Sequence, residues 1–140
     1  MPSILSSNRI RRNVSGFIPA TLWAVLVVIL SLSSPTLVME LSWTDMTGID
    51  KMGHLVFYCV LTLWVFYGFF RLPKRYRYTG TITALICVLF GTGMELLQGW
   101  MRVGRQFEYL DILANVVGVL CGYCIFIFLL KKKYYGSHEH

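Results

Sequence analysis

The sequence predicts an all-α polytopic membrane protein, with four transmembrane helices in a compact bundle and both termini on the cytoplasmic side. Hydrophobic residues make up 56% of the 140 residues and charged residues only 14%, whereas a soluble domain is about a quarter charged. The mean hydropathy is +0.60, and the apolar residues gather into four stretches long enough to cross a bilayer. This composition disfavours a soluble enzyme, a disulfide-rich module and a disordered chain.

The four predicted spans lie within a single domain of residues 1–140. The first span follows three arginines, as the apolar region of a signal peptide follows its basic residues, but the span is longer than such a region. Pro35 also directly follows the small residues at which a peptidase would cut, so we expect this segment to be retained. The other three are longer than most soluble core helices and show no polar stripe. The spans cover residues 16–39, 52–70, 78–97 and 112–130.

The basic residues predict the orientation. Ten of the thirteen Lys and Arg residues precede the first span, fill the second connection or follow the fourth span. The positive-inside rule therefore places both termini and the second connection in the cytoplasm, and the first and third connections outside. Because these charges are explained as topology anchors and no nucleic-acid motif accompanies them, we expect no nucleic-acid partner.

The cysteines fall inside the predicted spans. Cys121 and Cys124 have the spacing of a redox motif, but that chemistry needs an accessible thiolate at a helix N-terminus. We interpret them as buried small hydrophobic residues and expect no structural disulfide. His138 and His140, at the end of the chain, form only a weak metal pattern.

Polar residues enter three of the spans at their outward ends. The spacings i, i+3, i+7 and i, i+4 place each group on one face of its helix. A charged group at this depth costs about 2–3 kcal/mol unless it is paired or hydrated. Gly118 and Gly122 lie one turn apart on the face of Asn115 and favour close helix approach. The groups are Lys51, His54 and Tyr58; Glu95, Gln98 and Arg102; and Asp111 and Asn115, preceded by Arg105.

Two interpretations of these residues remain open. In one, they form a packing network in which Glu95 pairs with Lys51, Arg105 or both. In the other, the polar faces turn toward one another because an orphan polar face in lipid is costly, and they line a ligand cavity open to the outer leaflet. The predicted lining consists of His54, Glu95, Gln98, Arg105, Asp111 and Asn115.

The same residues resemble the motif of the VanZ-like family, named for a small membrane protein associated with low-level resistance to the glycopeptide teicoplanin. The resemblance covers residues 26–130 and implies a multi-pass protein of the bacterial cytoplasmic (inner) membrane that acts on the envelope side, without an established reaction. Arg102 and Glu108 are not part of the motif. The matching residues are Asp50-Lys51-Met52-Gly53-His54 with Tyr58, Glu95 with Gln98, Gly104-Arg105-Gln106-Phe107, and Asp111, Asn115, Gly118 and Gly122.

The first functional hypothesis is binding or modification of an anionic or lipid-linked envelope component or a lipophilic glycopeptide. Lys51 and Arg105 would hold the anionic group, Gln98 and Asn115 would orient it, and Tyr58 belongs to the same ligand-binding set. Membrane lipid would surround the apolar walls and accept an acyl or isoprenoid chain.

The second hypothesis is a transferase or hydrolase at the same place. His54 would be the general acid/base, with Glu95 or Asp111 orienting it or acting as a second acid/base. A metal held by His54, Glu95 and Asp111 is conceivable. Lys51 and Arg105 would equally neutralise the carboxylates, however, so we expect no metal and no cofactor. A small transporter is a third hypothesis, weakened because the cytoplasmic halves of the spans lack ionisable residues.

Overall fold

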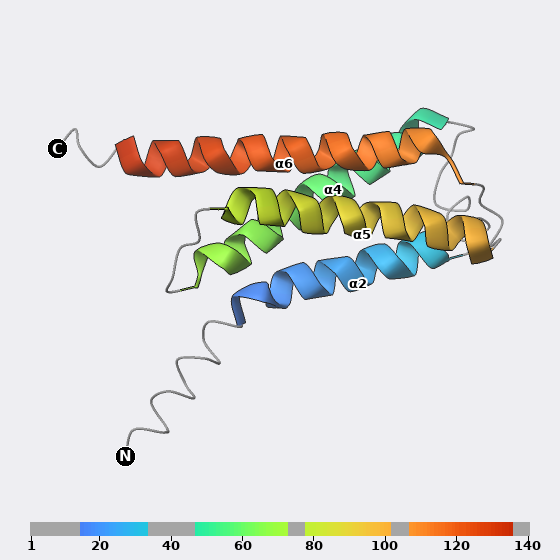
Figure 1. The fold of residues 1–140 in the computed structure, drawn as a ribbon, viewed down its shortest axis with the longest axis horizontal. Helices are drawn as coiled ribbons and strands as arrows, with labels where there is room; N and C mark the ends of the chain where they lie inside the picture. The colour runs from blue at the N-terminus through green and yellow to red at the C-terminus, as the bar shows by residue number, and fades with distance from the viewer. Residues whose placement is uncertain (1–14, 34–46, 73–77, 102–106, 136–140) are drawn as a thin grey trace, which may run out of the picture.

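The computed structural model describes residues 15–33, 47–72, 78–101 and 107–135, and they form helices without a strand among them. A short 3-10 helix, η1 (Ser15–Phe17), leads into the first long helix (Figure 1). Each of the four helical spans is long and apolar enough to cross a membrane, which confirms the predicted all-α multi-pass fold. The long helices are α2 (Ile18–Leu32), α4 (Thr47–Phe70), α5 (Thr79–Met101) and α6 (Tyr109–Tyr135).

Three of the helices are longer than the hydropathy pattern predicted. Helix α4 begins at Thr47 instead of residue 52, α5 continues to Met101, and α6 extends at both ends. Hydropathy marks only the part of a helix that lies in hydrocarbon, whereas backbone hydrogen bonding continues into the headgroup layer. Helix α2 ends at Leu32, and the remaining predicted part of the first span lies outside the described residues.

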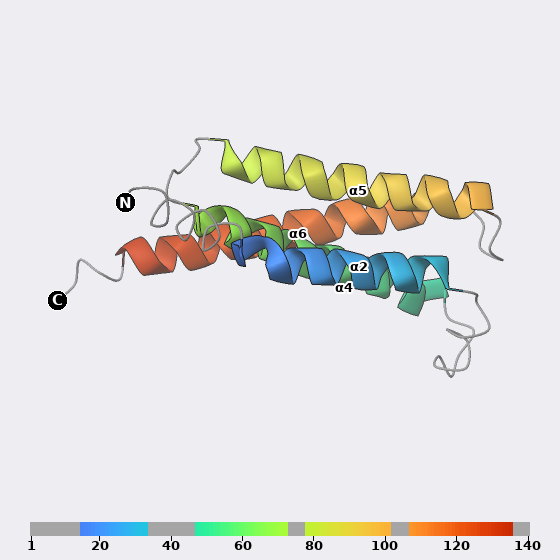
Figure 2. The same cartoon turned by 90° about the horizontal axis from the view of Figure 1, so that it is seen from below.

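Successive helices run antiparallel, so the start of α2 and the end of α6 lie at the same end of the bundle (Figures 1 and 2). The opposite end contains the ends of α2 and α5 and the starts of α4 and α6. We call this the polar end, because the polar groups predicted from sequence lie there. Trp100 and Tyr109 are strongly exposed at this end, as expected for aromatic residues at a membrane interface.

Helix α4 packs against the other three helices, and its contact with α6 is the most extensive in the bundle. Glycine makes this close approach possible. A Cβ added at Gly122 would lie 2.7 Å from the backbone oxygen of Cys59, and one added at Gly118 would overlap the backbone oxygen of Leu55. Further along the same pair, Phe66 and Phe126 stack with ring centroids 4.2 Å apart. Small residues therefore set the spacing of α4 and α6 near the polar end, as in other membrane helix pairs.

Helix α2 is attached to α4 by a hydrogen bond within the apolar region. The indole Nε1 of Trp23 donates to the backbone oxygen of Phe57 over 2.9 Å, and the two rings lie 5.7 Å apart. Toward the other end, the rings of Phe17 and Phe69 meet edge to face at 5.2 Å. In lipid, where association gains little from the hydrophobic effect, such packing and polar contacts hold helices together.

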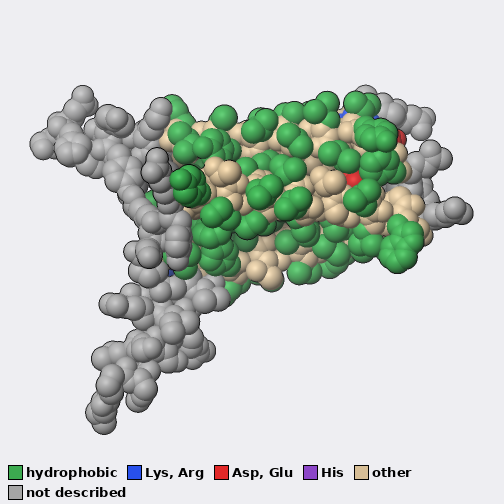
Figure 3. All heavy atoms as spheres, in the orientation of Figure 1, with side chains coloured by type: hydrophobic (Ala, Val, Ile, Leu, Met, Phe, Trp, Pro, Cys, Tyr) green, Lys and Arg blue, Asp and Glu red, His purple; other side chains and the backbone are tan. Residues whose placement is uncertain are grey.

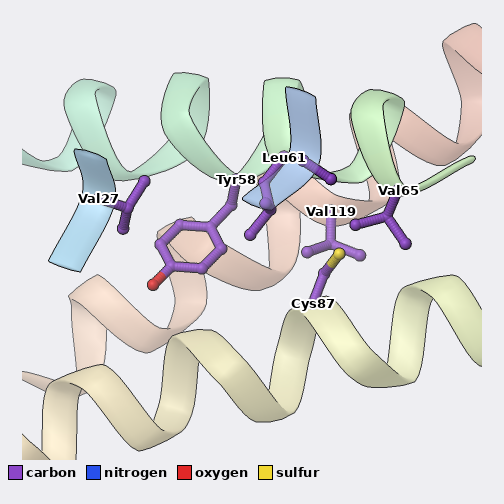
Figure 4. Close-up of a cluster of buried hydrophobic side chains, with 7 residues drawn as sticks. Val27, Tyr58, Leu61, Val65, Cys87 and Val119 are labelled. Atoms are coloured by element: carbon purple, nitrogen blue, oxygen red, sulfur yellow. The ribbon is translucent and has the colours of Figure 1, made fainter. Parts of the chain in front are cut away.

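The core contains side chains from all four helices, including Val27, Tyr58, Cys87 and Val119 (Figure 4). The face of the bundle seen in Figure 3 is largely apolar over its length, and large hydrophobic side chains are exposed on all four long helices, as lipid contact requires. Cys121 and Cys124 lie on this exposed surface, so their predicted burial inside the protein is wrong. Lipid accommodates a small apolar side chain as well as a protein core does, and sequence periodicity did not distinguish the two.

Candidate functional site

The polar residues predicted from three helices meet at the polar end because the helices alternate in direction. His54 lies in the second turn of α4, Glu95 and Gln98 in the last two turns of α5, and Asp111 and Asn115 in the first two turns of α6. Glu95, Gln98, Asp111 and Asn115 are buried among apolar helices. The i, i+3 and i, i+4 spacings therefore correctly predicted inward-facing polar side chains.

His54 is the centre of the buried group. Its Nδ1 lies 3.0 Å from Oδ1 of Asn115 and 3.4 Å from Oε1 of Glu95. Glu95 and Asn115 are each 1% exposed, and the His54 side chain is 10% exposed. Two oxygen acceptors facing Nδ1 favour a proton on that nitrogen, which leaves Nε2 of a neutral imidazole as the acceptor. The contacts of Nδ1 therefore favour the tautomer in which Nε2 carries the lone pair.

Tyr58 lies one turn beyond His54 on α4 and packs deeper in the bundle. Its buried ring occupies space that Gly91 of α5 leaves free, since a Cβ there would lie 2.9 Å from Cε1 of Tyr58 and 3.1 Å from Nδ2 of Asn115. The ring projects among core side chains from all four helices (Figure 4). The contacts of Tyr58 are those of a core residue that supports the position of Asn115, and its predicted ligand-binding role stays a prediction.

Gln98 links α5 to α2. Its Nε2 donates to the backbone oxygen of Ser31 over 2.7 Å. Ser31 lies in the last turn of α2, where backbone oxygens have no partner within the helix. Gln98 therefore caps α2 from a neighbouring helix, a contact that helical periodicity cannot predict. Its part in orienting a ligand stays a prediction.

Lys51 makes ion pairs with two carboxylates. Its Nζ lies 3.0 Å from Oε2 of Glu108 and 3.6 Å from Oδ1 of Asp111. The Glu108 side chain is 52% exposed and that of Asp111 only 8%, so the network runs from the surface into the bundle. Glu108 lies outside the family motif, and the sequence analysis did not predict its contact with Lys51. The predicted partner Arg105 lies outside the described residues, as does Arg102.

Asp50, His54 and Asp111 form a group with metal-ligating atoms within 4.8 Å of one another. The metal set considered from the sequence had Glu95 in place of Asp50. Asp50 was missed as a site residue, although its i, i+4 spacing to His54 places the two on one helix face. This group shares His54 with the buried contact among His54, Glu95 and Asn115, but its other two members differ.

The class of the protein follows from this geometry: a multi-pass helical membrane protein with a buried polar cluster at one end of its bundle. Comparison with protein families shows which family this is. Residues 4–130 match the sequence model of the family described as VanZ/LLP1. The chain belongs to the VanZ/LLP1 family, which confirms the resemblance seen in its motif.

An uncharacterized protein of fission yeast (Schizosaccharomyces pombe) is 38% identical over 85 residues, which cover 60% of this chain and 49% of the relative. The chain therefore matches about half the length of that relative. No solved structure matches the chain.

Proposed function

We propose that this VanZ/LLP1-family protein binds, at its polar end, the anionic head of an amphiphile: a lipid-linked envelope component or a lipophilic glycopeptide such as teicoplanin. The observation that carries the proposal is the meeting of His54, Glu95 and Asn115, from three helices, within an otherwise apolar bundle. Nδ2 of buried Asn115 has no hydrogen-bond partner among the described residues. Because an unused buried donor is costly, a ligand acceptor at this point would stabilise the cluster.

The roles of the two predicted cations differ in this proposal. Lys51 already contacts Glu108 and Asp111, so it acts by fixing those carboxylates. Arg105 is the predicted group for bidentate contact with a phosphate or carboxylate. The distribution of basic residues favours a polar end that faces outward with both termini inside. The bacterial cytoplasmic membrane is what the family resemblance implies. The acyl or isoprenoid chain of the ligand would lie along the apolar helix surface.

The test is expression in a teicoplanin-susceptible bacterium, with susceptibility measured for teicoplanin and for a glycopeptide without an acyl chain. We expect protection against teicoplanin that is lost in His54→Ala and Asn115→Ala. Thr81→Ala is the matched control, because this exposed α5 residue lies at the opposite end of the bundle. Membrane levels of all variants are compared by immunoblot.

If His54→Ala and Asn115→Ala insert normally and retain full protection, the binding proposal fails. The cluster is then a packing network, which was the alternative interpretation of the sequence.

A second candidate function is hydrolysis or group transfer on a lipid-linked, phosphorylated substrate, favoured by the 3.4 Å contact between His54 Nδ1 and Glu95 Oε1. A carboxylate on one ring nitrogen orients a histidine that accepts a proton on the other. In hydrolysis, a water oxygen would bond to phosphorus as its proton passes to His54 Nε2. The phosphorus bond to the leaving oxygen would break, and that oxygen would take the proton from His54.

Phosphate release from a polyprenyl pyrophosphate by the purified protein tests the enzymatic function. We expect release to be lost in His54→Gln and kept in Thr81→Ala. Release that is absent, or equal in the wild type and His54→Gln, would count against catalysis while leaving the binding proposal intact.

A further inference from the structure

A group of three potential metal ligands lies between α4 and α6 at the polar end. Asp50 and His54 are one turn apart on α4, and Asp111 lies in the first turn of α6. One ligand atom from each residue lies within 4.8 Å of the others. The group combines an imidazole with two carboxylates. The close pairing of α4 and α6 brings Asp111 near Asp50, which lies 61 positions earlier in the sequence.

We propose that Asp50, His54 and Asp111 bind a divalent transition-metal cation, such as Zn²⁺ or Mn²⁺, with His54 coordinating through Nε2, a role that would replace the acid/base role of that nitrogen in the second candidate function. Imidazole suits transition metals and carboxylate oxygens suit harder cations, so this mixed set fits the divalent first-row ions. The site does not depend on the amphiphile, because it is argued from contacts of the chain alone.

The surroundings of His54 prepare it for this role. Glu95 Oε1 and Asn115 Oδ1 both face Nδ1, so the ring can donate there while Nε2 coordinates. Histidine ligands in metal sites commonly donate their second ring nitrogen to a carboxylate or carbonyl oxygen, which fixes the tautomer and the ring plane. Glu95 and Asn115 are thus positioned as supports for a metal ligand and would not themselves coordinate.

The distances allow coordination with small side-chain movements. Ligands about 2.1 Å from a cation are about 3 Å apart at adjacent positions and about 4.2 Å apart at opposite ones. One ligand atom of each residue lies within 4.8 Å of the others, so a pair at adjacent positions needs to draw together by up to about 1.8 Å and an opposite pair by up to about 0.6 Å. Asp50 is exposed, so its carboxylate is at the open side of the group. Its exposure also leaves coordination positions accessible from the polar end.

Asp111 supplies a second, independent reason. Its Oδ1 is buried and accepts no hydrogen bond from the described part of the chain. The ammonium of Lys51, 3.6 Å away, is its ion-pair partner and is held more closely by Glu108 at 3.0 Å. A cation bound at Oδ1 would satisfy this buried oxygen directly, while Lys51 remained on Glu108. Lys51 is therefore a competitor of the metal, and removing it should tighten binding.

The experiment uses the full chain with His138→Ala and His140→Ala, which removes the histidines of the tail as rival ligands. The protein is purified in detergent, treated with EDTA and dialysed against Zn²⁺ or Mn²⁺, and bound metal is counted by mass spectrometry. We expect a stoichiometry of about one cation per chain, and affinity about tenfold or more weaker in Asp50→Asn and His54→Gln. Lys51→Met should bind more tightly by about threefold or more.

The matched control is Glu108→Gln made in the Lys51→Met background, where no ammonium freed from Glu108 can compete for Asp111. It removes the same charge as Asp50→Asn from the same end of the bundle without removing a proposed ligand. Affinity in this double variant should stay within about threefold of that of Lys51→Met. The proposal is overturned if the parent retains no cation, if Asp50→Asn binds normally, or if Glu108→Gln in the Lys51→Met background weakens binding as much as Asp50→Asn. The last result would mean diffuse attraction to an acidic surface. Because neither teicoplanin nor a lipid-linked envelope component is present, each result is independent of the teicoplanin assay.

Discussion

Replacing Gly118 with alanine should push α4 and α6 apart beside the polar cluster. The added Cβ would overlap the backbone oxygen of Leu55 and lie 3.0 Å from its C and 3.1 Å from its Cα, whereas ordinary contacts begin at 3.4 Å. These atoms belong to the backbone of α4, so no side-chain rotation relieves the overlap. The helices must separate by about 0.5–1 Å, an overpacking that costs about 1–3 kcal/mol.

The separation should also reach His54, the neighbour of Leu55. Its Nδ1 lies 3.0 Å from Oδ1 of Asn115 on α6, and a shift of up to about 1 Å lengthens this contact beyond hydrogen-bonding distance. Gly118→Ala is therefore expected to lower both stability and any activity that depends on His54.

Gly93→Ala is the matched control. A Cβ at Gly93 meets nothing within 4 Å, so this variant should gain up to about 1 kcal/mol from helix propensity without strain. The free energy of unfolding is measured for both variants in detergent micelles by circular dichroism during titration with sodium dodecyl sulfate. If Gly118→Ala is as stable as Gly93→Ala, the close contact of α4 and α6 does not set their spacing and the reasoning is wrong.

Three further predictions concern orientation, helix attachment and the buried carboxylate. Cysteines introduced at Ser42 and Ser137 should be labelled from outside and inside the cell respectively, and the reverse pattern would contradict the positive-inside assignment. Trp23→Phe removes the hydrogen bond to the α4 backbone and should lower the free energy of unfolding by about 1 kcal/mol; in Trp64→Phe, at an exposed position, we expect a smaller change. Glu95→Gln keeps the shape of the side chain and should leave membrane expression near normal but weaken teicoplanin protection, so full protection would argue against a role for the carboxylate.

The sequence by itself determined the number of spans, their order and the end of the bundle at which polar residues gather. Hydropathy reports where a helix crosses lipid, and helical spacing reports which residues share a face. These properties depend only on neighbours along the chain. The spacing of His54, Glu95 and Asn115 was therefore enough to predict that their helices turn polar faces inward at one membrane side.

The partners of those residues were decided only by the tertiary structure. Lys51 contacts Glu108, Gln98 contacts the backbone of Ser31, and Asp50 joins His54 near Asp111. Such pairings depend on how far each helix rotates and shifts along its axis, which is set by the close contact at Gly118 and by other packing between helices. Periodicity shows which residues share a helix face. It does not show how far the opposite helix is rotated or shifted along its axis, because many combinations of rotation and shift satisfy the same apolar pattern.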